Sequence, residues 1–345
     1  MTHVALAVGV VDRLQRLSSE RGLEVGERLR AIQPLLGDDL FAVERALSVG
    51  SGSRDVHRGA EHLVRSGGKR LRPICVVLAA KLGTGFSPEA LELAVAAELV
   101  HSATLLHDDV VDDGVSRRGA PTTRVVYGNA ISIFAGDWLL IDALRRVRRS
   151  ATSDVIDRLL DVIDEMIVAE SLQLERRGRI NASYDAWSAV AKGKTAALFR
   201  WAIYAGARAG GLPVSDAEAL EGFGASLGMA FQAVDDVLDL VGDAAVTGKM
   251  LFADLREGKS SLPVVLALRR DPTLAQPLAA AAEGATSDAY AGMAERIAAT
   301  GAIDEARSIA RDHTDAAVAV LERYPASPAR SALAEIARSM TARAV

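Results

Sequence analysis

Two aspartate clusters are the residues of this sequence whose type and spacing most clearly suit chemistry. The first is Asp108-Asp109-Val110-Val111-Asp112 and the second is Asp235-Asp236-Val237-Leu238-Asp239. In a helix, the first and last aspartate of each cluster lie on one face because they are four residues apart. Neighbouring carboxylates oppose one another's ionisation, so a cation must compensate their charge. Mg²⁺ prefers such oxygen ligands, and Mg²⁺ held by carboxylates commonly also binds substrate phosphates.

The alternative reading of one such cluster is a solvated acidic helix end. We would favour that reading for a single copy. Here the same pattern occurs twice, each time on an otherwise apolar segment. Two such helices facing each other across a cavity would place six carboxylates around one space, which favours a metal site.

Basic residues accompany both acidic clusters. Gly67-Gly68-Lys69-Arg70-Leu71-Arg72-Pro73 places three cations beside a glycine pair at a predicted helix start, which is a typical anion-binding arrangement. The other cations near the clusters are Arg117, Arg118, Lys194, Lys249 and Lys259. Each is most often solvated when considered singly. Together with the acids they predict a site for two polyanions, or for one polyanion with Mg²⁺.

Composition limits the classes of protein that this chain can represent. The chain has 345 residues, is 50% hydrophobic and carries a formal net charge of -5, which gives no support for nucleic-acid binding. Cys75 is the only cysteine, so no internal disulfide can form and a reducing cytoplasm is expected. No signal peptide is expected, and the longest apolar candidate for a membrane span, 130–144, contains Asp137 and Asp142.

The elements that must position these residues are predicted to be helices almost throughout. Apolar residues recur at spacings of three and four, with few alternating runs. Ser87-Pro88 should start the first aspartate helix, and Gly114 should be the C′ residue after its end. The second aspartate helix should span 216–241, and 184–210 should form one further helix. We therefore expect an all-α fold, with residues 1–345 as a single-domain bundle of roughly ten or more helices around a central cavity.

With these motifs in view, the sequence resembles the trans-isoprenyl (polyprenyl) diphosphate synthases of the medium- or long-chain type. The matching motifs are GGKRLRP, LLHDDVVD, RRGAPT, GKTAALF, FQAVDDVLD and DLREGKSSLP, in the family's order from Gly67 to Pro263. A lone DDxxD motif is weak, but their joint occurrence is highly specific. The resemblance implies an all-helical homodimer that transfers isopentenyl diphosphate onto an allylic diphosphate. Departures at Ala120, Ala169, Trp187 and Met250-Leu251 remove no charged ligand.

The resemblance also implies a role for each matching residue. About three Mg²⁺ ions would be held by Asp108, Asp112, Asp235 and Asp239, with Asp109 and Asp236 as supporting acids. The allylic diphosphate would contact Arg117, Lys194 and Lys249, with Lys259 as an extra cation. Isopentenyl diphosphate would contact Lys69, Arg72, His101 and Arg118. The catalytic residues, those nearest the reacting atoms, would be Lys194, Thr195, Gln232, Asp108 and Asp235.

Small residues that precede the first aspartate cluster on the same predicted helix would affect the length of the product. Ala103 and Thr104 lie one turn before Asp108, where farnesyl-type relatives carry bulky aromatic residues. The next turns offer Val100, Ala97 and Ala96, which favours a tail longer than geranylgeranyl. Candidates for the floor of the tail pocket are Trp138, Leu159, Leu160 and Ile163.

Several other functions stay open at this stage. A geranylgeranyl diphosphate synthase is the nearest alternative. A class I terpene cyclase normally has a different second metal motif and lacks GGKRLRP. A regulatory subunit of a heteromeric prenyltransferase tends to lose one aspartate motif. A metal phosphohydrolase is suggested by His107-Asp108, but the chain has only 6 histidines and no further His-Asp pair.

Overall fold

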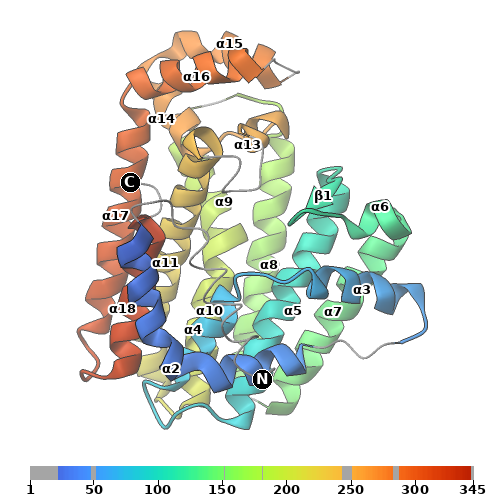
Figure 1. Cartoon of the computed structure of the whole chain (residues 1–345), viewed down its shortest axis with the longest axis vertical. Helices are drawn as coiled ribbons and strands as arrows, with labels where there is room; N and C mark the ends of the chain where they lie inside the picture. Colours follow the sequence, from blue (N-terminus) through green and yellow to red (C-terminus); the bar gives the residue numbers. More distant parts are fainter. Residues whose placement is uncertain are drawn as a thin grey trace.

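The computed structural model describes residues 22–47, 52–150, 152–180, 182–242, 251–282 and 287–342, which are almost entirely helical (Figure 1). The elements are α2 (Gly22–Ala46), α3 (Asp55–Arg65), α4 (Leu71–Ala80), α5 (Pro88–Val111), β1 (Ser116–Arg117), β2 (Ala120–Pro121), α6 (Thr123–Tyr127), α7 (Asn129–Ser150), α8 (Ser153–Glu175), α9 (Tyr184–Val190), the π-helix η1 (Ala191–Ala196), α10 (Ala197–Ala209), α11 (Val214–Val241), α13 (Ala253–Arg256), α14 (Leu262–Arg270), the 3₁₀-helix η2 (Pro272–Leu274), α15 (Ala275–Ala282), α16 (Ser287–Ala299), α17 (Ala302–Leu321) and α18 (Pro328–Thr341). The predicted all-α fold is confirmed.

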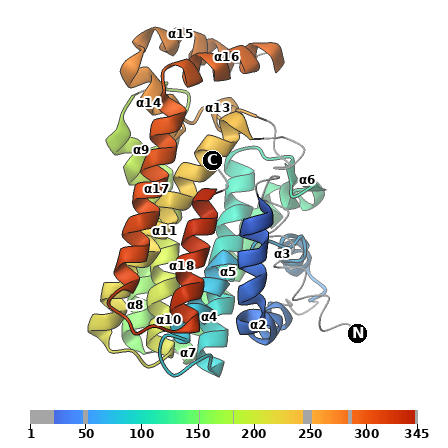
Figure 2. The same cartoon turned by 60° about the vertical axis from the view of Figure 1, so that its left-hand side comes forward.

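The long helices run side by side along the long axis of the molecule, and α15 and α16 lie across one end (Figure 1). Helix α5 packs against α4, α7 and α10, while α11 packs against α10 and α17. Figure 2 shows α17 and α18 together on one outer side, with α2 beside α18. The two helices that carry the aspartate clusters, α5 and α11, are therefore both interior members of the bundle and share α10 as a neighbour.

The apolar core consists of two clusters of buried side chains. The larger cluster joins α4, α5, α7 and α10, and the smaller one joins α9, the end of α11 and the helices from α14 to α17. Helix α4 is buried at nearly every position, and α10 approaches it closely. A methyl group added at Gly206 would lie 2.3 Å from the backbone oxygen of Val76, which is closer than packed atoms allow. This small residue therefore sets the spacing between α4 and α10.

Local signals explain where α5 starts and ends. Ser87 is the N-cap and accepts a hydrogen bond from the Ala90 backbone at 3.2 Å, as predicted. The predicted C′ residue is wrong by one position, because Asp113 has the positive φ of 53°. Gly114 is the following residue. Its backbone N–H donates to the backbone carbonyl oxygen of Asp109 at 2.9 Å, which completes a Schellman motif. Asp112 thus caps the helix at its negative end.

Two further elements differ from the sequence prediction. The single helix predicted over 184–210 is divided into α9, η1 and α10, with a π-helical turn at its centre. The hairpin of β1 and β2 was not predicted, and it pairs Ser116 with Pro121. Its turn residues Arg118 and Gly119 both have positive φ, 54° and 79°, which matches the twist of a two-residue hairpin. The hairpin fixes the backbone of Arg117 and Arg118 beside the first aspartate cluster.

Two further predictions concern single segments. Cys75 is fully buried in α4, and burial raises the pKa of its thiol to about 12 although Arg72 partly offsets the effect. This confirms that it is a structural residue. In the parts of the chain that the structure describes, no helix has the length and apolar character needed to cross a bilayer.

A buried ion pair ties α4, α5 and α2 together. The Arg70 guanidinium binds Glu98 at 2.6 Å and Glu44 at 2.8 Å, and both Arg70 and Glu98 are almost inaccessible to solvent. Burial alone would lower the pKa of Arg70, but Glu98 and Glu44 raise it above its ordinary value. Arg70 belongs to the basic motif, but it is a structural member of that motif.

We expect Arg70→Ala to destabilise the fold by about 3–5 kcal/mol, because it leaves the Glu98 carboxylate buried without its cation. Urea unfolding followed by circular dichroism measures this effect. Arg65→Ala is the matched control, since Arg65 is exposed and its one ion pair among the described residues is with Glu61 on its own helix. Equal unfolding midpoints for the two variants would contradict the assignment.

Candidate active site

The first aspartate cluster meets a lysine from the π-helical turn. Lys194 Nζ lies 3.5 Å from Asp108 Oδ2, donates to Gln173 at 3.1 Å and forms a short contact with Glu170. Burial raises the pKa of Asp108; Lys194 opposes this shift, and Glu170 and Asp112 add to it. The ammonium group of Lys194 is therefore shared between an aspartate of α5 and a glutamate of α8.

Asp112 meets a second lysine in a parallel arrangement. Lys259 Nζ lies 2.7 Å from Asp112 and 2.7 Å from Glu257. Burial would lower the pKa of Lys259, but Glu257 and Asp112 together raise it above its ordinary value. Arg177 adds a third cation, with its guanidinium 3.5 Å from Asp112 and donating to the Val111 backbone oxygen. Each outer aspartate of the first cluster thus shares a lysine with a glutamate outside both motifs.

The middle aspartate of this cluster has a different environment. Asp109 is buried, and its Oδ1 accepts two hydrogen bonds from Arg117 at 2.9 and 2.7 Å. Oδ2 is also buried, with no hydrogen-bond partner among the described residues. This geometry fits the supporting role predicted for Asp109, and it shows that Arg117 is held by the protein itself.

The second cluster is organised around Asp236. Its buried carboxylate accepts hydrogen bonds from Trp187 Nε1, Gln232 Nε2 and the Leu262 backbone, each at 2.7 Å. Burial and the nearby Asp254 raise the pKa of Asp236 to about 7, while these donors act in the opposite direction. Asp236 therefore joins α9, α11 and the start of α14, in keeping with a supporting role.

The flanking aspartates of the second cluster differ from each other. Asp239 is buried and accepts hydrogen bonds from the Ala253 and Asp254 backbones at 2.9 and 3.4 Å, so it caps the short helix α13. Asp235 is half-buried on the same helix, α11. Lys249, which is predicted to contact the allylic diphosphate, lies outside the described residues.

The π-helical turn links the two clusters. Thr195 Oγ1 donates to Gln232 Oε1 at 2.6 Å, and Gln232 then donates to Asp236. Lys194, the preceding residue, contacts Asp108. Consecutive residues of η1 therefore touch both aspartate helices, and π-helical turns are frequent at functional sites. The structure brings together the predicted catalytic residues Lys194, Thr195, Gln232 and Asp108.

A second group of cations surrounds His101. The Arg72 guanidinium lies 4.6 Å from the centre of the Phe199 ring, and its buried Nε has no hydrogen-bond partner among the described residues. Burial lowers the pKa of His101 well below its usual value, and Arg72 and Arg118 add to the effect. The imidazole is therefore neutral at pH 7. A methyl group added at Gly68 would lie 3.1 Å from the Arg118 guanidinium, so the glycine pair leaves room for that cation.

Lys69 reaches from this cation group toward the second aspartate helix. Its Nζ lies 5.4 Å from the centre of the Phe231 ring, and Phe231 directly precedes Gln232. The predicted contacts of isopentenyl diphosphate, Lys69, Arg72, His101 and Arg118, thus form one group of donors. Three cations beside one imidazole suit an anionic ligand.

The carboxylates fit a divalent cation that displaces the lysines. In residues 22–342, gaps excepted, no three acidic, histidine or cysteine side chains form a ready-made metal cluster. However, Glu170 Oε1 and Asp109 Oδ2 are buried without a hydrogen-bond donor among the described residues, and such oxygens are costly to leave unsatisfied. An oxygen-only donor set of this type suits Mg²⁺ or Ca²⁺ better than a softer metal.

Sequence reasoning missed three residues of this site: Glu170, Glu257 and Arg177. No spacing rule connects them to the aspartate clusters, because α8 and the segment before α14 meet α5 only in the folded chain. One signal was available for Glu170. It is a charged residue in the AESLQLE stretch of an amphipathic helix, three residues before Gln173, so both face one side.

Comparison with known proteins identifies the family. The model of the polyprenyl synthetase family matches residues 54–295. The chain is 34% identical over 314 residues to heptaprenyl diphosphate synthase component 2 of Geobacillus stearothermophilus, covering 90% of this chain and 97% of the relative. The chain belongs to the polyprenyl synthetase family. Membership makes it a prenyltransferase, and the predicted family is confirmed.

Relatives within the polyprenyl synthetase family differ in the product length that their names give. A short chain isoprenyl diphosphate synthase of Methanothermobacter thermautotrophicus is 35% identical over 285 residues, covering 81% of this chain and 88% of the relative. The crystal structure of a polyprenyl synthase from Caulobacter crescentus, complexed with calcium and isoprenyl diphosphate, has a TM-score of 0.86 and 35% identity, covering 92% of this chain and 98% of that one. The fold agrees with that of family members.

We expect Glu170→Gln to lower kcat for prenyl transfer by about tenfold, because Lys194 loses its carboxylate anchor and a buried acceptor beside Asp108 loses its charge. Steady-state assays of purified protein measure this. Glu175→Gln, an exposed position on the same helix, is the control and should leave kcat unchanged. If the two variants behave alike, Glu170 has no part in the site.

Proposed function

We propose that this chain is a Mg²⁺-dependent trans-prenyltransferase that condenses isopentenyl diphosphate with an allylic diphosphate. The observation that carries the proposal is the π-helical turn, where Lys194 contacts Asp108 while Thr195 bonds to Gln232. This turn contacts both helices that carry the aspartate clusters, which supports one site shared by the two clusters. The donor group around His101 supports a second diphosphate position.

The residues that would hold Mg²⁺ are Asp108, Asp112 and Asp235, with Asp239 at the edge of the set. Bound Mg²⁺ supplies stabilisation of the negative charge that develops on the leaving diphosphate. Lys194 and Lys259 add positive charge at the same place, since each already lies against one of the first two aspartates.

The second substrate is held by the cations around His101. Lys69, Arg72 and Arg118 bind the diphosphate of isopentenyl diphosphate, and neutral His101 provides a hydrogen bond to it. The apolar walls exclude water from the allylic cation that forms when the carbon–oxygen bond breaks. The double bond of isopentenyl diphosphate attacks that cation, and the proton that is then lost passes to the released diphosphate.

The proposed product is longer than geranylgeranyl. Ala103 is 1% exposed on α5, and the turns behind it carry the buried Val100, Ala97 and Ala96. None of these four side chains is aromatic, so α5 itself contributes no aromatic barrier at these positions. Of the floor candidates, Leu159 is buried, whereas Leu160 is 49% exposed on the outer face of α8 and does not line the interior. A geranylgeranyl diphosphate synthase is the alternative.

Product analysis tests the function. Purified protein is incubated with Mg²⁺, isopentenyl diphosphate and one of four primers: dimethylallyl, geranyl, farnesyl or geranylgeranyl diphosphate. The dephosphorylated products are then sized by chromatography. We expect products beyond geranylgeranyl, and none from Asp108→Ala. Absence of elongation with every primer would rule out the proposal for the isolated chain and favour a partner-dependent subunit.

We expect Ala103→Phe to shorten the product by placing an aromatic side chain across the path of the tail. The same chromatographic sizing measures the change. Ala291→Phe, on the exposed face of α16, is the control and should leave the product length unchanged. An unchanged product distribution in Ala103→Phe would show that the tail does not pass this residue.

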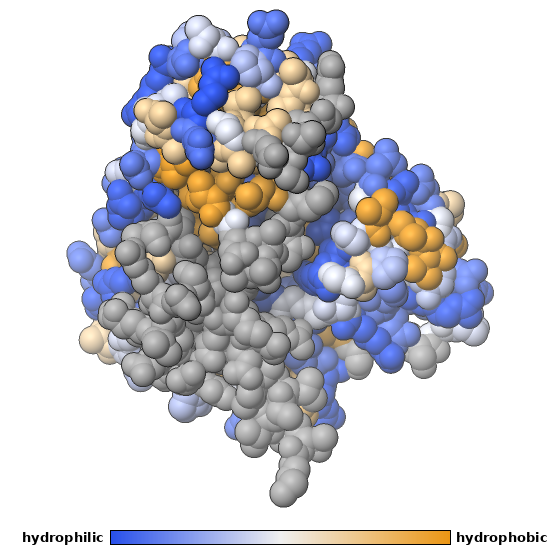
Figure 3. All heavy atoms as spheres, turned by 45° about the horizontal axis from the view of Figure 1, so that its top comes forward, coloured by the Kyte–Doolittle hydropathy of each residue, from blue (hydrophilic) through white to orange (hydrophobic). Residues whose placement is uncertain are grey.

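We also propose that the chain forms a homodimer in the cytoplasm. Exposed apolar residues follow the outer faces of α7 and α8, which pack together. They are Ile133, Phe134, Ile141, Leu160, Ile167, Val168 and Leu174. Because they are spaced seven or eight residues apart, they form a stripe along one face of each helix. Exposed apolar stripes of this kind are usually buried against another protein surface. Val115, Val125 and Val126 add a further exposed group on the protrusion that carries α6, where hydrophobic residues gather (Figure 3).

We expect Val168→Lys to convert the dimer to a monomer, because a lysine in the stripe would be desolvated by the partner. Light scattering coupled to gel filtration measures the mass. Val214→Lys, at an exposed position on α11, is the control and should leave the dimer intact. A monomeric wild-type chain would overturn the homodimer and point to a different subunit as the cover.

A further inference from the structure

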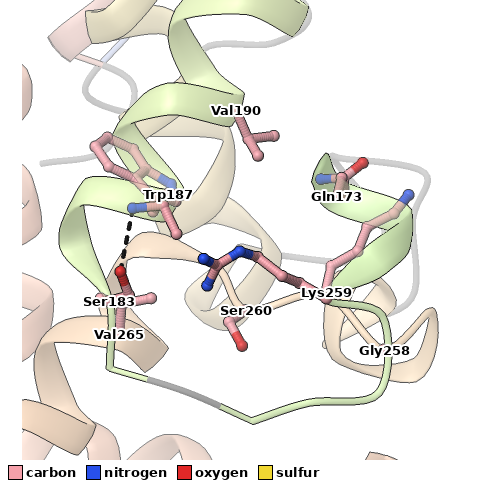
Figure 4. Close-up of a pocket in the computed structure, with 10 residues that line it drawn as sticks. Gln173, Ser183, Trp187, Val190, Gly258, Lys259, Ser260 and Val265 are labelled. Atoms are coloured by element: carbon pink, nitrogen blue, oxygen red, sulfur yellow. Dashed lines mark hydrogen bonds between the residues drawn. The ribbon is translucent and has the colours of Figure 1, made fainter. Parts of the chain in front are cut away.

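A small side pocket adjoins the active site behind Lys259. It lies between the end of α8, helix α9 and the segment that leads into α14 (Figure 4). Gln173 and Lys259 are on one side of it and Trp187 is on the other, with Ser260 below (Figure 4). The cavity measures about 60 Å³, which suits a small ion and excludes a prenyl tail.

The lining of this side pocket contains hydrogen-bond donors that the protein does not use. The Arg176 guanidinium makes no hydrogen bond or ion pair with any residue that the structure describes. Ser260 Oγ is buried and has no hydrogen-bond partner in the same part of the chain. Gln173 accepts from Lys194 through Oε1, so its amide nitrogen keeps both N–H groups. Buried or confined donors without acceptors are costly unless a ligand or water supplies them.

The charge of the side pocket is also unusual for this chain. Two cations, Arg176 and Lys259, line it, and none of its lining side chains is acidic. The chain as a whole carries a net charge of -5. Lys259 is held by Asp112 and Glu257, which lie outside the lining, whereas no acidic side chain of the described ranges forms an ion pair with Arg176. A cleft with one sign of charge concentrates ions of the other sign.

We propose that this side pocket binds a compact phosphate-type anion, with Arg176 and Ser260 as its main contacts. The source of the anion rests on the proposed function, since each prenyl transfer releases inorganic diphosphate. The recognition chemistry does not rest on it, because the unpartnered donors are present whatever the reaction. An anion in the side pocket gives Lys259 an additional acceptor that competes with Asp112. Inorganic diphosphate therefore acts at a position that adjoins the allylic diphosphate site through Lys259, and Arg176 and Ser260 are contacts of the side pocket alone.

The binding test uses the full chain in EDTA, so that no divalent cation recruits phosphates to the aspartates. Inorganic diphosphate and geranyl diphosphate are titrated separately by calorimetry. We expect Arg176→Gln to weaken binding of inorganic diphosphate by at least about tenfold, since a charged hydrogen-bond donor is lost. Arg311→Gln, an exposed arginine on α17, is the control and should leave binding unchanged. Binding of geranyl diphosphate should be the same in all three proteins.

Two results would overturn the proposal. Equal affinity of the wild type and Arg176→Gln for inorganic diphosphate would show that the side pocket holds no anion. An equal loss of geranyl diphosphate binding in Arg176→Gln would place Arg176 in a substrate position instead. Ser260→Ala gives an independent check; it removes a hydroxyl that has no partner, so folding is preserved while diphosphate affinity falls.

Kinetics separate this inference from the proposed function. In the wild type, inhibition by inorganic diphosphate should include a component that is noncompetitive toward the allylic substrate. Arg176→Gln should lose that component and retain kcat. If the wild type elongates no primer, the proposed function fails, and the calorimetric comparison still decides whether the side pocket binds the anion. If the wild type elongates primers and its inhibition is purely competitive, the side-pocket proposal alone fails.

Discussion

Charge compensation of carboxylates at the end of one helix is the constraint on which the rest of the site depends. Asp108 and Asp112 lie at the negative end of α5, and burial together with the nearby Glu170 and Asp112 raises the pKa of Asp108. Lys194 and Lys259 compensate this negative charge, and each lies between one aspartate and one glutamate. Glu170 and Glu257 hold the two lysines independently of the aspartates, so this positive charge has anchors of its own beside the first cluster.

The backbone around these lysines follows from the same requirement. Lys194 must reach α5 and α8 while Thr195 reaches α11, and a regular α-helix turns consecutive side chains by about 100°. The π-helical turn changes this angle locally and lets neighbouring residues serve different helices. On the other side, the hairpin of β1 and β2 holds Arg117 against Asp109 and Arg118 beside Gly68. Two irregular elements thus position Lys194, Arg117 and Arg118, while the regular helices α5 and α11 carry the aspartates.

The sequence was sufficient to locate helix α5 and insufficient for these irregular elements. Periodicity and the Ser87-Pro88 cap located α5, because helical spacing and capping are local properties. The π-helical turn was missed because AKGKTA keeps the composition of an ordinary helix, and its backbone is decided by packing against α8 and α11. The glutamate partners of the lysines were missed for a similar reason, since Glu170 and Asp108 are 62 positions apart in number and meet only through the fold. Arg70 shows the converse, because a residue inside a functional motif proved to be part of the buried framework.

Trp187 joins the second cluster to the side pocket, since it donates to Asp236 and forms part of the pocket wall. The chain has three tryptophans, and Trp201 is sealed in the core with its own backbone partner. The indole of Trp187 is hydrogen-bonded to a carboxylate whose surroundings change when charge enters the site. Its emission is therefore an intrinsic probe of the surroundings of Asp236, and observing it needs neither a coloured substrate nor an attached dye.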